Sequence, residues 1–387
     1  MTGSGSPHLR ARDGRPQTTT PAELLFDLVY AFAITQVSHL LIAHLSFRSA
    51  VHAALLFFVI WWAWIYTTWM VNWFDPGTSR VRLIVVGCGL SSLLMAAAVP
   101  TAFTTHPVLF AGAYVILQVG RNVAAAVLLE RDHTLRRVLE RLVAWSVLSG
   151  SFWLAGAFAP PSARLAIWGA ALLLDLVAPL VGYWTPGLGR SGTLDYPVEG
   201  GHFAERFQSF LIIVLGESIV VTGATASAGP LDAVSVLALG VAFLITGGLW
   251  WLYFGIVAEH SRRRIAEADD PALLARDAYT YLHLPIVAGV IMVSVGDDLL
   301  ISHPTDTLNT AGIVMLAGGP ALFLAGEVLF RIRMTASVGR PRVVAVVGLL
   351  VAGVLAGGGS ALLVGAAVVS VLSALALWEQ RGLRNAV

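Results

Sequence analysis

Repeated apolar stretches of about 20 residues constrain this chain more than any other feature of its sequence. A helix of that length crosses the hydrocarbon core of a bilayer, which is about 30 Å thick. Hydrophobic residues make up 57% of the 387-residue chain. The sequence therefore predicts an all-α, polytopic bundle of about twelve transmembrane helices. These helices are expected at roughly 24–45, 50–71, 82–103, 107–129, 141–158, 163–183, 203–223, 233–255, 281–301, 308–329, 343–357 and 360–378.

The basic residues are distributed by topology. The chain has no lysine, so its 24 Lys+Arg residues are all arginines. Between the expected helices, only Arg48 and Arg164 lie in loops on one side of the membrane, and the remaining loop and terminal arginines lie on the other. Because cytoplasmic loops carry an excess of basic residues, this asymmetry predicts that both termini are cytoplasmic.

The predicted domain organisation is simple. Residues 1–20 are rich in Gly, Ser, Pro, Thr and Arg and have no apolar signal core, which is typical of a disordered cytoplasmic tail. A single transmembrane helical domain is expected over 21–380. A Trp pair recurs in the second helix of each half, and an Ala-Glu pair opens the first. We interpret these recurrences as a possible six-plus-six parallel repeat with halves 21–185 and 200–380, although Trp pairs could also recur by chance.

Several broad classes of function are disfavoured. The arginines are spread rather than gathered into a patch, so we expect no nucleic-acid partner. The single Cys88 excludes an internal disulfide and a Cys-rich metal site, and no metal or cofactor is expected. A phosphate-binding loop of the Gly-x-x-x-x-Gly-Lys type is impossible without lysine. The expected partners are the lipid bilayer and an unidentified small molecule or proton.

Ionisable residues inside the apolar stretches are the candidate site, because a charge in the bilayer is costly unless it is paired or hydrated. Glu23 and Asp27 share one face of the first helix, and Glu23 also suits the positive end of a helix that begins at Pro21. The helix at 203–223 carries a polar stripe, and three further helices carry one residue each. The full set of substrate or proton-binding candidates is Glu23, Asp27, Arg121, Asp175, His202, Glu205, Arg206, Glu217 and His283.

Acids outnumber arginines within this set. Some of the acids should therefore be neutral, or should bind a cation or proton in turn. The alternative is that interhelical ion pairs only fix the packing. Because lipid accommodates neither polar stripe, we predict that the helix at 24–45 packs against the helix at 203–223. Arg206 or Arg121 should then pair with an acid, and Asp175 should lie beside them.

Two stretches carry a resemblance to a known family. The segments PAELLFDLVYAFAITQVSHLL, from Pro21 to Leu41, and HFAERFQSFLIIVLGESIVVT, from His202 to Thr222, resemble the signature stretches of the bacterial low-temperature-requirement A family. Weaker similarity covers 175–179, 281–287 and the Trp-rich second helix. The resemblance implies a multi-pass protein of the bacterial plasma (inner) membrane. It implies no particular reaction, because the family name records a growth phenotype.

Three interpretations of function remain open. The first is a proton-coupled secondary transporter or permease that uses the buried carboxylates. The second is an intramembrane enzyme in which a neutral carboxyl acts as general acid on a lipid or isoprenoid. In that case Trp61, Trp62, Trp250 and Trp251 would line the site and stabilise a cation. The third is a structural or sensory membrane protein. The sequence favours a transporter over an enzyme.

Overall fold

The fold is all-α, as the sequence predicted. A computed structural model describes residues 6–13 and 17–384, and no β-strand forms among them. Nine helices in these ranges are long and apolar enough to cross a membrane. A tenth span is possible if α12 (Thr310–Leu316) and α13 (Gly318–Thr335), which are bent by 43° at a short break, form one crossing.

Each of the twelve apolar stretches contains a helix. The two not counted above are α6 (Pro161–Val177) and α14 (Arg340–Ala356), with 17 residues each. That length is at the lower end of what spans a bilayer, about 17 residues. The exact number of crossings therefore stays a prediction, whereas the polytopic helical bundle is confirmed.

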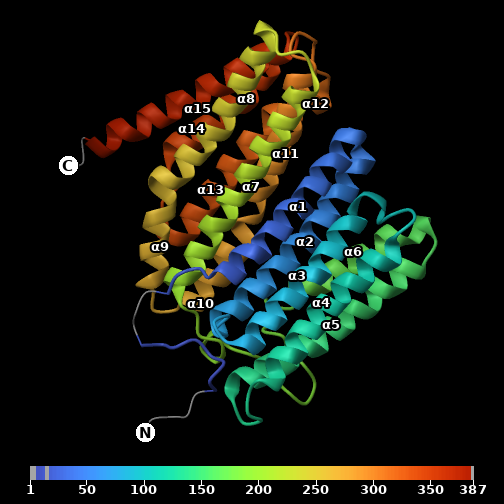
Figure 1. The fold of residues 1–387 in the computed structure, drawn as a ribbon. Coiled ribbons are helices and arrows are strands. Elements are labelled where there is room, and N and C mark those ends of the chain that lie inside the picture. The colour runs from blue at the N-terminus through green and yellow to red at the C-terminus, as the bar shows by residue number, and fades with distance from the viewer. Residues whose placement is uncertain (1–5, 14–16, 385–387) are drawn as a thin grey trace. The chain divides into compact units, whose positions relative to one another are not determined.

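The chain forms two compact units. Unit 1 comprises Met1–Val37, Val51–Phe207 and Ile265–Arg276. It contains most of α1 (Pro21–Ala43) and α2 (Phe47–Trp73), the first turns of α7 (Gly200–Ala228), and all of α3 (Ser79–Ala98), α4 (Pro107–Val127), α5 (Thr134–Phe158), α6 and the short α10 (Pro271–Leu274). Helices α3 to α6 pack in chain order, as Figure 1 shows in light blue to green.

Unit 2 comprises Ser38–Ala50, Gln208–Arg264 and Asp277–Val387. It contains the end of α1, the start of α2, the rest of α7, α8 (Ala233–Leu252), most of α9 (Ala258–Ala266), α11 (Leu284–Ser302), α12, α13, α14 and α15 (Ala361–Arg384). Two π-helical segments, Tyr253–Val257 and Ala275–Tyr281, interrupt the α-helical pattern. The unit boundaries lie close to those of the predicted halves, but 38–50 and 265–276 change sides.

Glycines bring α11 into backbone contact with both α12 and α13 within unit 2. A Cβ atom on Gly289 would lie 2.6 Å from the nitrogen of Phe323, and one on Gly296 would lie 2.7 Å from Cα of Leu316. On the facing helix, a Cβ on Gly319 would lie 2.9 Å from the nitrogen of Val293. Small residues at such crossings are the usual means of close packing in membrane bundles, where the hydrophobic effect does not join helices.

Part of the segment for which the sequence predicted disorder has a defined conformation. Residues 6–13 and 17–20 are described, and they run beside the cytoplasmic-side ends expected for α1 and α2. The Arg10 nitrogen donates to the carbonyl of Trp73 at 2.9 Å, and the Asp75 nitrogen donates to the carbonyl of His8 at 2.9 Å. Residues 1–5 and 14–16 lie outside the described residues.

Candidate functional site

The first turns of α1 and α7 meet in unit 1 through a buried ion pair. Both guanidinium nitrogens of Arg206 donate to the two carboxylate oxygens of Asp27 at 2.7 Å. The indole nitrogen of Trp64 on α2 donates to Oδ1 of Asp27 at 2.8 Å. This bidentate geometry is the strongest form of an arginine–carboxylate contact. The predicted pairing of Arg206 with an acid of the first helix is therefore present.

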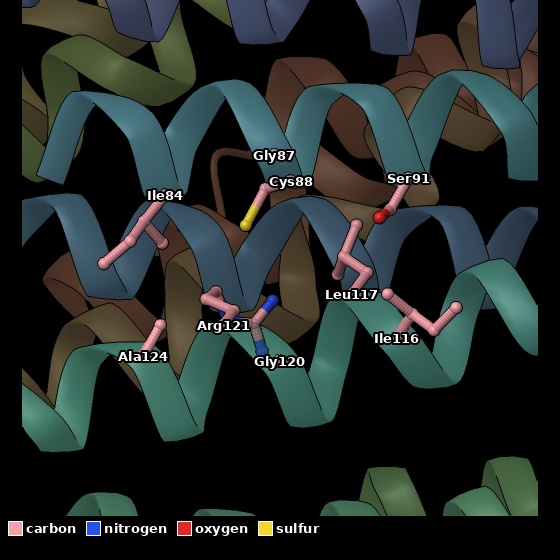
Figure 2. A pocket seen from close by; sticks show the side chains of 9 residues that line it. All are labelled: Ile84, Gly87, Cys88, Ser91, Ile116, Leu117, Gly120, Arg121 and Ala124. Carbon is pink, nitrogen blue, oxygen red and sulfur yellow. The ribbon is translucent and has the colours of Figure 1, made fainter. Parts of the chain in front are cut away.

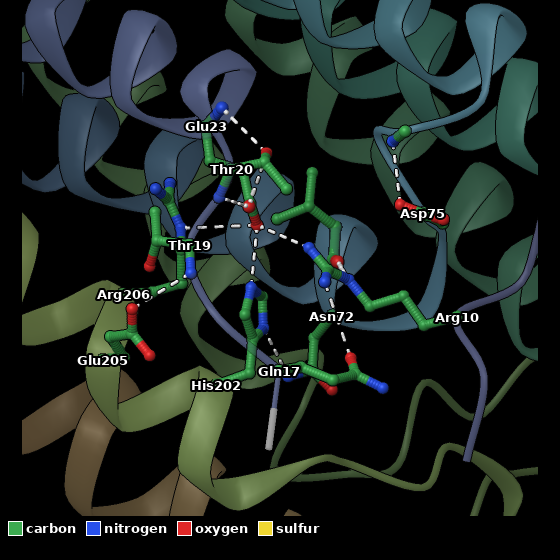
Figure 3. Close-up of polar contacts among 12 residues, drawn as sticks. Arg10, Gln17, Thr19, Thr20, Glu23, Asn72, Asp75, His202, Glu205 and Arg206 are labelled. Atoms are coloured by element: carbon green, nitrogen blue, oxygen red, sulfur yellow. Dashed lines mark hydrogen bonds and ion pairs between the residues drawn. The ribbon is translucent and has the colours of Figure 1, made fainter. Parts of the chain in front are cut away.

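Glu23 occupies the same junction, one turn before Asp27. The Thr20 nitrogen donates to Oε2 of Glu23 at 2.7 Å, and the Glu23 nitrogen donates back to Oγ1 of Thr20 at 3.4 Å. Together with Pro21 at the first helical position, this is a capping box that starts α1. The other oxygen, Oε1, accepts from Nε2 of His202 at 2.9 Å and from Nη2 of Arg10 at 3.0 Å. Figure 3 shows these contacts converging on one carboxylate.

The hydrogen-bond network determines the protonation of His202. Oδ1 of Asn72 accepts from the Glu199 nitrogen at 2.9 Å, so the Asn72 amide nitrogen must point the other way. That nitrogen lies 3.1 Å from Nδ1 of His202, which therefore accepts. A neutral His202 with its proton on Nε2, donated to Glu23, satisfies every partner.

The N-terminal segment closes this junction from one side. Arg10 reaches Glu23 as described, and its Nε donates to the carbonyl of Val71 at 2.6 Å. The Thr19 nitrogen donates to Oε1 of Glu205 at 3.0 Å, so Glu205 lies at the edge of the site and holds the segment. Arg12 donates to the Asn72 carbonyl at 3.0 Å. The site is thus covered by residues that precede α1.

We call Arg10, Glu23, Asp27, His202 and Arg206 the α1–α7 cluster. Glu23, Asp27, His202 and Arg206 each have a relative exposure of 0%. Two acids face two arginines, so the cluster is neutral overall while His202 is neutral. Arg206 also lies within 3.9 Å of Glu23, which lets one guanidinium serve either acid. A single added proton would leave this enclosed group with an unbalanced charge.

A second buried network in unit 1 joins Arg121 to Asp175. Arg121 donates to the side-chain oxygen of Gln118, whose nitrogen donates to the Tyr114 hydroxyl at 3.0 Å. Tyr114 in turn donates to Oδ2 of Asp175 at 2.8 Å, and the indole of Trp153 donates to the same oxygen at 3.1 Å. Among the described residues no carboxylate lies within salt-bridge distance of Arg121. The network runs from α4 to α6 rather than to the first helix.

A groove opens beside Arg121 between α3 and α4. Its volume is about 340 Å³, which is within the range of small-molecule sites, roughly 300–1,000 Å³. Figure 2 shows its lining, in which Arg121 and Cys88 face each other among apolar side chains. Gly87 and Gly120 also line the groove and leave space in it. A Cβ atom on either would meet nothing within 4 Å and would therefore take up part of that space.

The remaining candidates divide between the units. Trp61 and Trp62 are buried in unit 1, and Trp61 contacts Phe207 at a ring distance of 5.9 Å. In unit 2, the ring nitrogen of His283 lies 2.9 Å from the Tyr253 hydroxyl. Glu217 is partly exposed there, while its neighbour Ser218 turns into the helix contacts.

Trp250 and Trp251 are half-exposed on α8, and Trp251 lines a pocket of about 200 Å³ between α8 and α15. Their relative exposures are 46% and 49%, whereas Trp61 and Trp62 are almost fully buried. The two Trp pairs that suggested an internal repeat thus differ in burial.

Sequence reasoning missed several buried charged groups. Asp297 on α11 has a relative exposure of 0%, and so have Glu327 and Arg342, which pair at 2.5 Å. Arg342 also makes two bonds with Glu379, at 2.8 and 2.9 Å. An acid inside an apolar stretch was the signal that singled out Glu217, and the same signal marks Asp297 and Glu327. Arg10 carried no such signal, because it precedes the first helix.

Comparison with known proteins was informative at the level of the family. A sequence model described as bacterial low temperature requirement A protein (LtrA) matches residues 18–377. The chain is also similar to a protein of Rhizobium meliloti (strain 1021) named uncharacterized protein RA0937. The two are 35% identical over 305 residues, which cover 79% of this chain and 75% of that protein. No solved structure matches the chain.

Proposed function

The chain belongs to the bacterial low temperature requirement A family of membrane proteins, and from that premise we propose that it is a proton-coupled secondary transporter. In this proposal the α1–α7 cluster takes up and releases the coupled proton. Asp27 and Glu23 are the proton acceptors, Arg206 is the cation they share, and His202 orients Glu23 by donating from Nε2.

The observation that carries the proposal is the charge balance of an enclosed site. A proton added to Asp27 would remove the counter-charge of Arg206, whose side chain is 1% exposed. An unpaired buried charge costs several kcal/mol, so the contact between α1 and α7 should loosen when the proton binds. Proton binding and a change in helix packing are then linked, as alternating access requires.

The proposed setting is the bacterial plasma membrane, with both termini in the cytoplasm. The arginine distribution supports this orientation, because the loops on the side of the termini hold nearly all the loop arginines. The cluster would then lie near the cytoplasmic end of α1 and α7. The N-terminal segment that covers it would act on the cytoplasmic side.

The test is proton movement into liposomes that contain the purified protein. A potassium diffusion potential drives the flux, a trapped pH-sensitive dye records it, and a small-molecule extract of bacterial cells is present or absent on the opposite side. We expect wild-type protein to move protons faster in the presence of the extract. Asp27→Asn should abolish this increase, because it removes the carboxylate that pairs with Arg206 and accepts the proton.

The matched control is Asp232→Asn. Asp232 caps α8 by accepting from the Ser235 nitrogen at 2.8 Å, and asparagine caps a helix equally well. Flux in this variant should equal that of wild type. The transport proposal would be refuted if Asp27→Asn and wild type moved protons at the same extract-dependent rate.

A second candidate function, an enzyme acting on a lipid, has one observation in its favour. The groove between α3 and α4 is apolar, holds the guanidinium of Arg121 and connects through Gln118 and Tyr114 to the carboxyl of Asp175. An amphiphile with an anionic group fits such a surface. Mass spectrometry of lipids from cells that express wild type or Arg121→Gln tests this candidate. A lipid whose mass changes only with wild type would support it.

A further inference from the structure

Three side-chain oxygens from three helices of unit 2 gather around one point. They are Oγ of Ser218 on α7, Oγ1 of Thr246 on α8 and Oδ2 of Asp297 on α11. Ser218 and Thr246 lie 3.4 Å apart, and each lies 3.5 Å from the carboxylate oxygen. All three residues are at least 97% buried, with relative exposures of 1%, 3% and 0%. The three oxygens therefore form a nearly equilateral triangle inside the helix bundle.

These separations are too long for good hydrogen bonds. Hydroxyl donors normally lie about 2.5–3.0 Å from an oxygen acceptor. The separations do match oxygens that share a cation. Ligands about 2.4 Å from a metal ion, as around calcium, lie about 3.4 Å apart when they subtend a right angle. Around magnesium, at about 2.05 Å, the same geometry gives only about 2.9 Å. The triangle thus fits an ion of the size of calcium or sodium, whose radii are nearly equal.

The charge of the site points to a monovalent ion. Asp297 has no arginine or histidine within salt-bridge distance among the described residues, and its other oxygen, Oδ1, has no hydrogen-bond partner there. The neighbouring Asp298 is engaged elsewhere, since it accepts from Thr225 at 2.7 Å. A lone buried carboxylate is costly in a membrane unless a positive charge accompanies it. Calcium sites normally supply more acids and six to eight oxygens.

From these contacts we infer that Ser218, Thr246 and Asp297 form a sodium-binding site. One carboxylate balances one sodium charge, and the two hydroxyls supply neutral oxygens. Ser294 lies one turn before Asp297 on α11 and is buried, and its hydroxyl also has no hydrogen-bond partner among the described residues. It stands on the same helix face and is the nearest candidate for a further ligand.

This inference does not rest on the proposed transport function. The triangle lies entirely in unit 2, whereas the α1–α7 cluster lies entirely in unit 1. Sodium binding is measured at equilibrium, without flux. A failure to bind sodium leaves the proton-flux experiment untouched, and a failure of proton flux leaves the binding experiment untouched.

The experiment measures binding of radioactive sodium to the purified full-length protein in detergent, with choline chloride holding ionic strength constant. Wild type should bind one sodium ion per chain in a saturable manner, and equal concentrations of potassium should not displace it. Asp297→Asn should abolish binding. Thr246→Val and Ser218→Ala each remove one hydroxyl with little change in shape, and each should weaken the affinity more than about tenfold, given the losses seen for outer-shell substitutions.

The matched control is Asp298→Asn, which changes the adjacent acid on α11 and should bind sodium as wild type does. Thermal unfolding of every variant verifies folding, and sodium should raise the melting temperature only where it binds. The inference is overturned if wild type binds no sodium or if potassium competes equally. Stoichiometric displacement by calcium, or unchanged affinity in Asp297→Asn and Thr246→Val, would also overturn it.

Discussion

Asp27 and Arg206 depend on each other, because each is fully buried and each satisfies the other's charge. Among the described residues, Arg206→Met would leave Asp27 with the indole of Trp64 as its one side-chain donor. We expect this variant to lower the free energy of unfolding by about 3–5 kcal/mol, the usual loss when one member of a buried pair is removed. Unfolding by urea in a mild detergent, followed by tryptophan fluorescence, measures the change.

The double variant Arg206→Met/Asp27→Leu, compared with the two single variants, isolates the contribution of the ion pair to stability from that of its surroundings. Removal of both charges leaves no unpaired charge, and only the indole nitrogen of Trp64 loses its acceptor, so the destabilisation should be smaller than the sum of the two single losses. Arg263→Met is the control, because Arg263 pairs with Glu259 at an exposed position and should change stability little. Additive losses in the double variant would mean that the two side chains act independently.

At the scale of helices, the contacts of α11 with α12 and α13 depend on the absence of side chains at the α11 glycines. Gly289→Ala and Gly296→Ala would each push a methyl group into the backbone of the facing helix. We expect each to destabilise unit 2 by about 1–3 kcal/mol, although alanine is otherwise the better helix former. Gly240→Ala on α8 meets nothing within 4 Å and should be neutral or stabilising. If thermal unfolding shows that Gly240→Ala destabilises the protein as much as the other two variants do, close packing is not the cause of their destabilisation.

The N-terminal segment is the other element whose position depends on a few contacts. Arg10→Gln removes the ion pair with Glu23 and weakens the bond to the Val71 carbonyl. Hydrogen exchange of residues 6–13 should then become faster, while exchange within α2 stays slow. Arg80→Gln, at an exposed position in the first turn of α3, is the control and should leave exchange unchanged. Equal exchange in Arg10→Gln and wild type would show that the contacts of Arg10 do not hold the segment and that its other contacts suffice.

For the whole molecule, the orientation in the membrane follows from the arginine distribution and is open to a direct test. Cys88 is the only cysteine of the sequence, so Cys88→Ser provides a background without thiols. On that background, Thr104→Cys and Asp132→Cys place single thiols at exposed positions in successive loops. An impermeant maleimide added to intact cells should label Thr104→Cys and not Asp132→Cys. The reverse pattern would invert the proposed topology.

Properties of local stretches could be read from the sequence. The helical class and the positions of the membrane helices follow from the length of apolar runs, which a bilayer enforces wherever they occur. The contact between the first turns of α1 and α7 was also predictable, because lipid cannot accommodate the polar stripe that each helix carries. Pro21 and Glu23 marked the start of α1 for the same local reason.

The choice of partner within the bundle was decided only by the tertiary structure. Arg121 connects to Asp175 through Gln118 and Tyr114, because the rotation of α4 points its polar face towards α6. Ser218 turns inward and Glu217 only partly so, which a helical wheel does not distinguish when the neighbouring helices are unknown. Asp297 meets a serine 79 residues away and a threonine 51 residues away. Such meetings depend on helix rotation, tilt and neighbour identity, and none of these is a property of a single stretch of sequence.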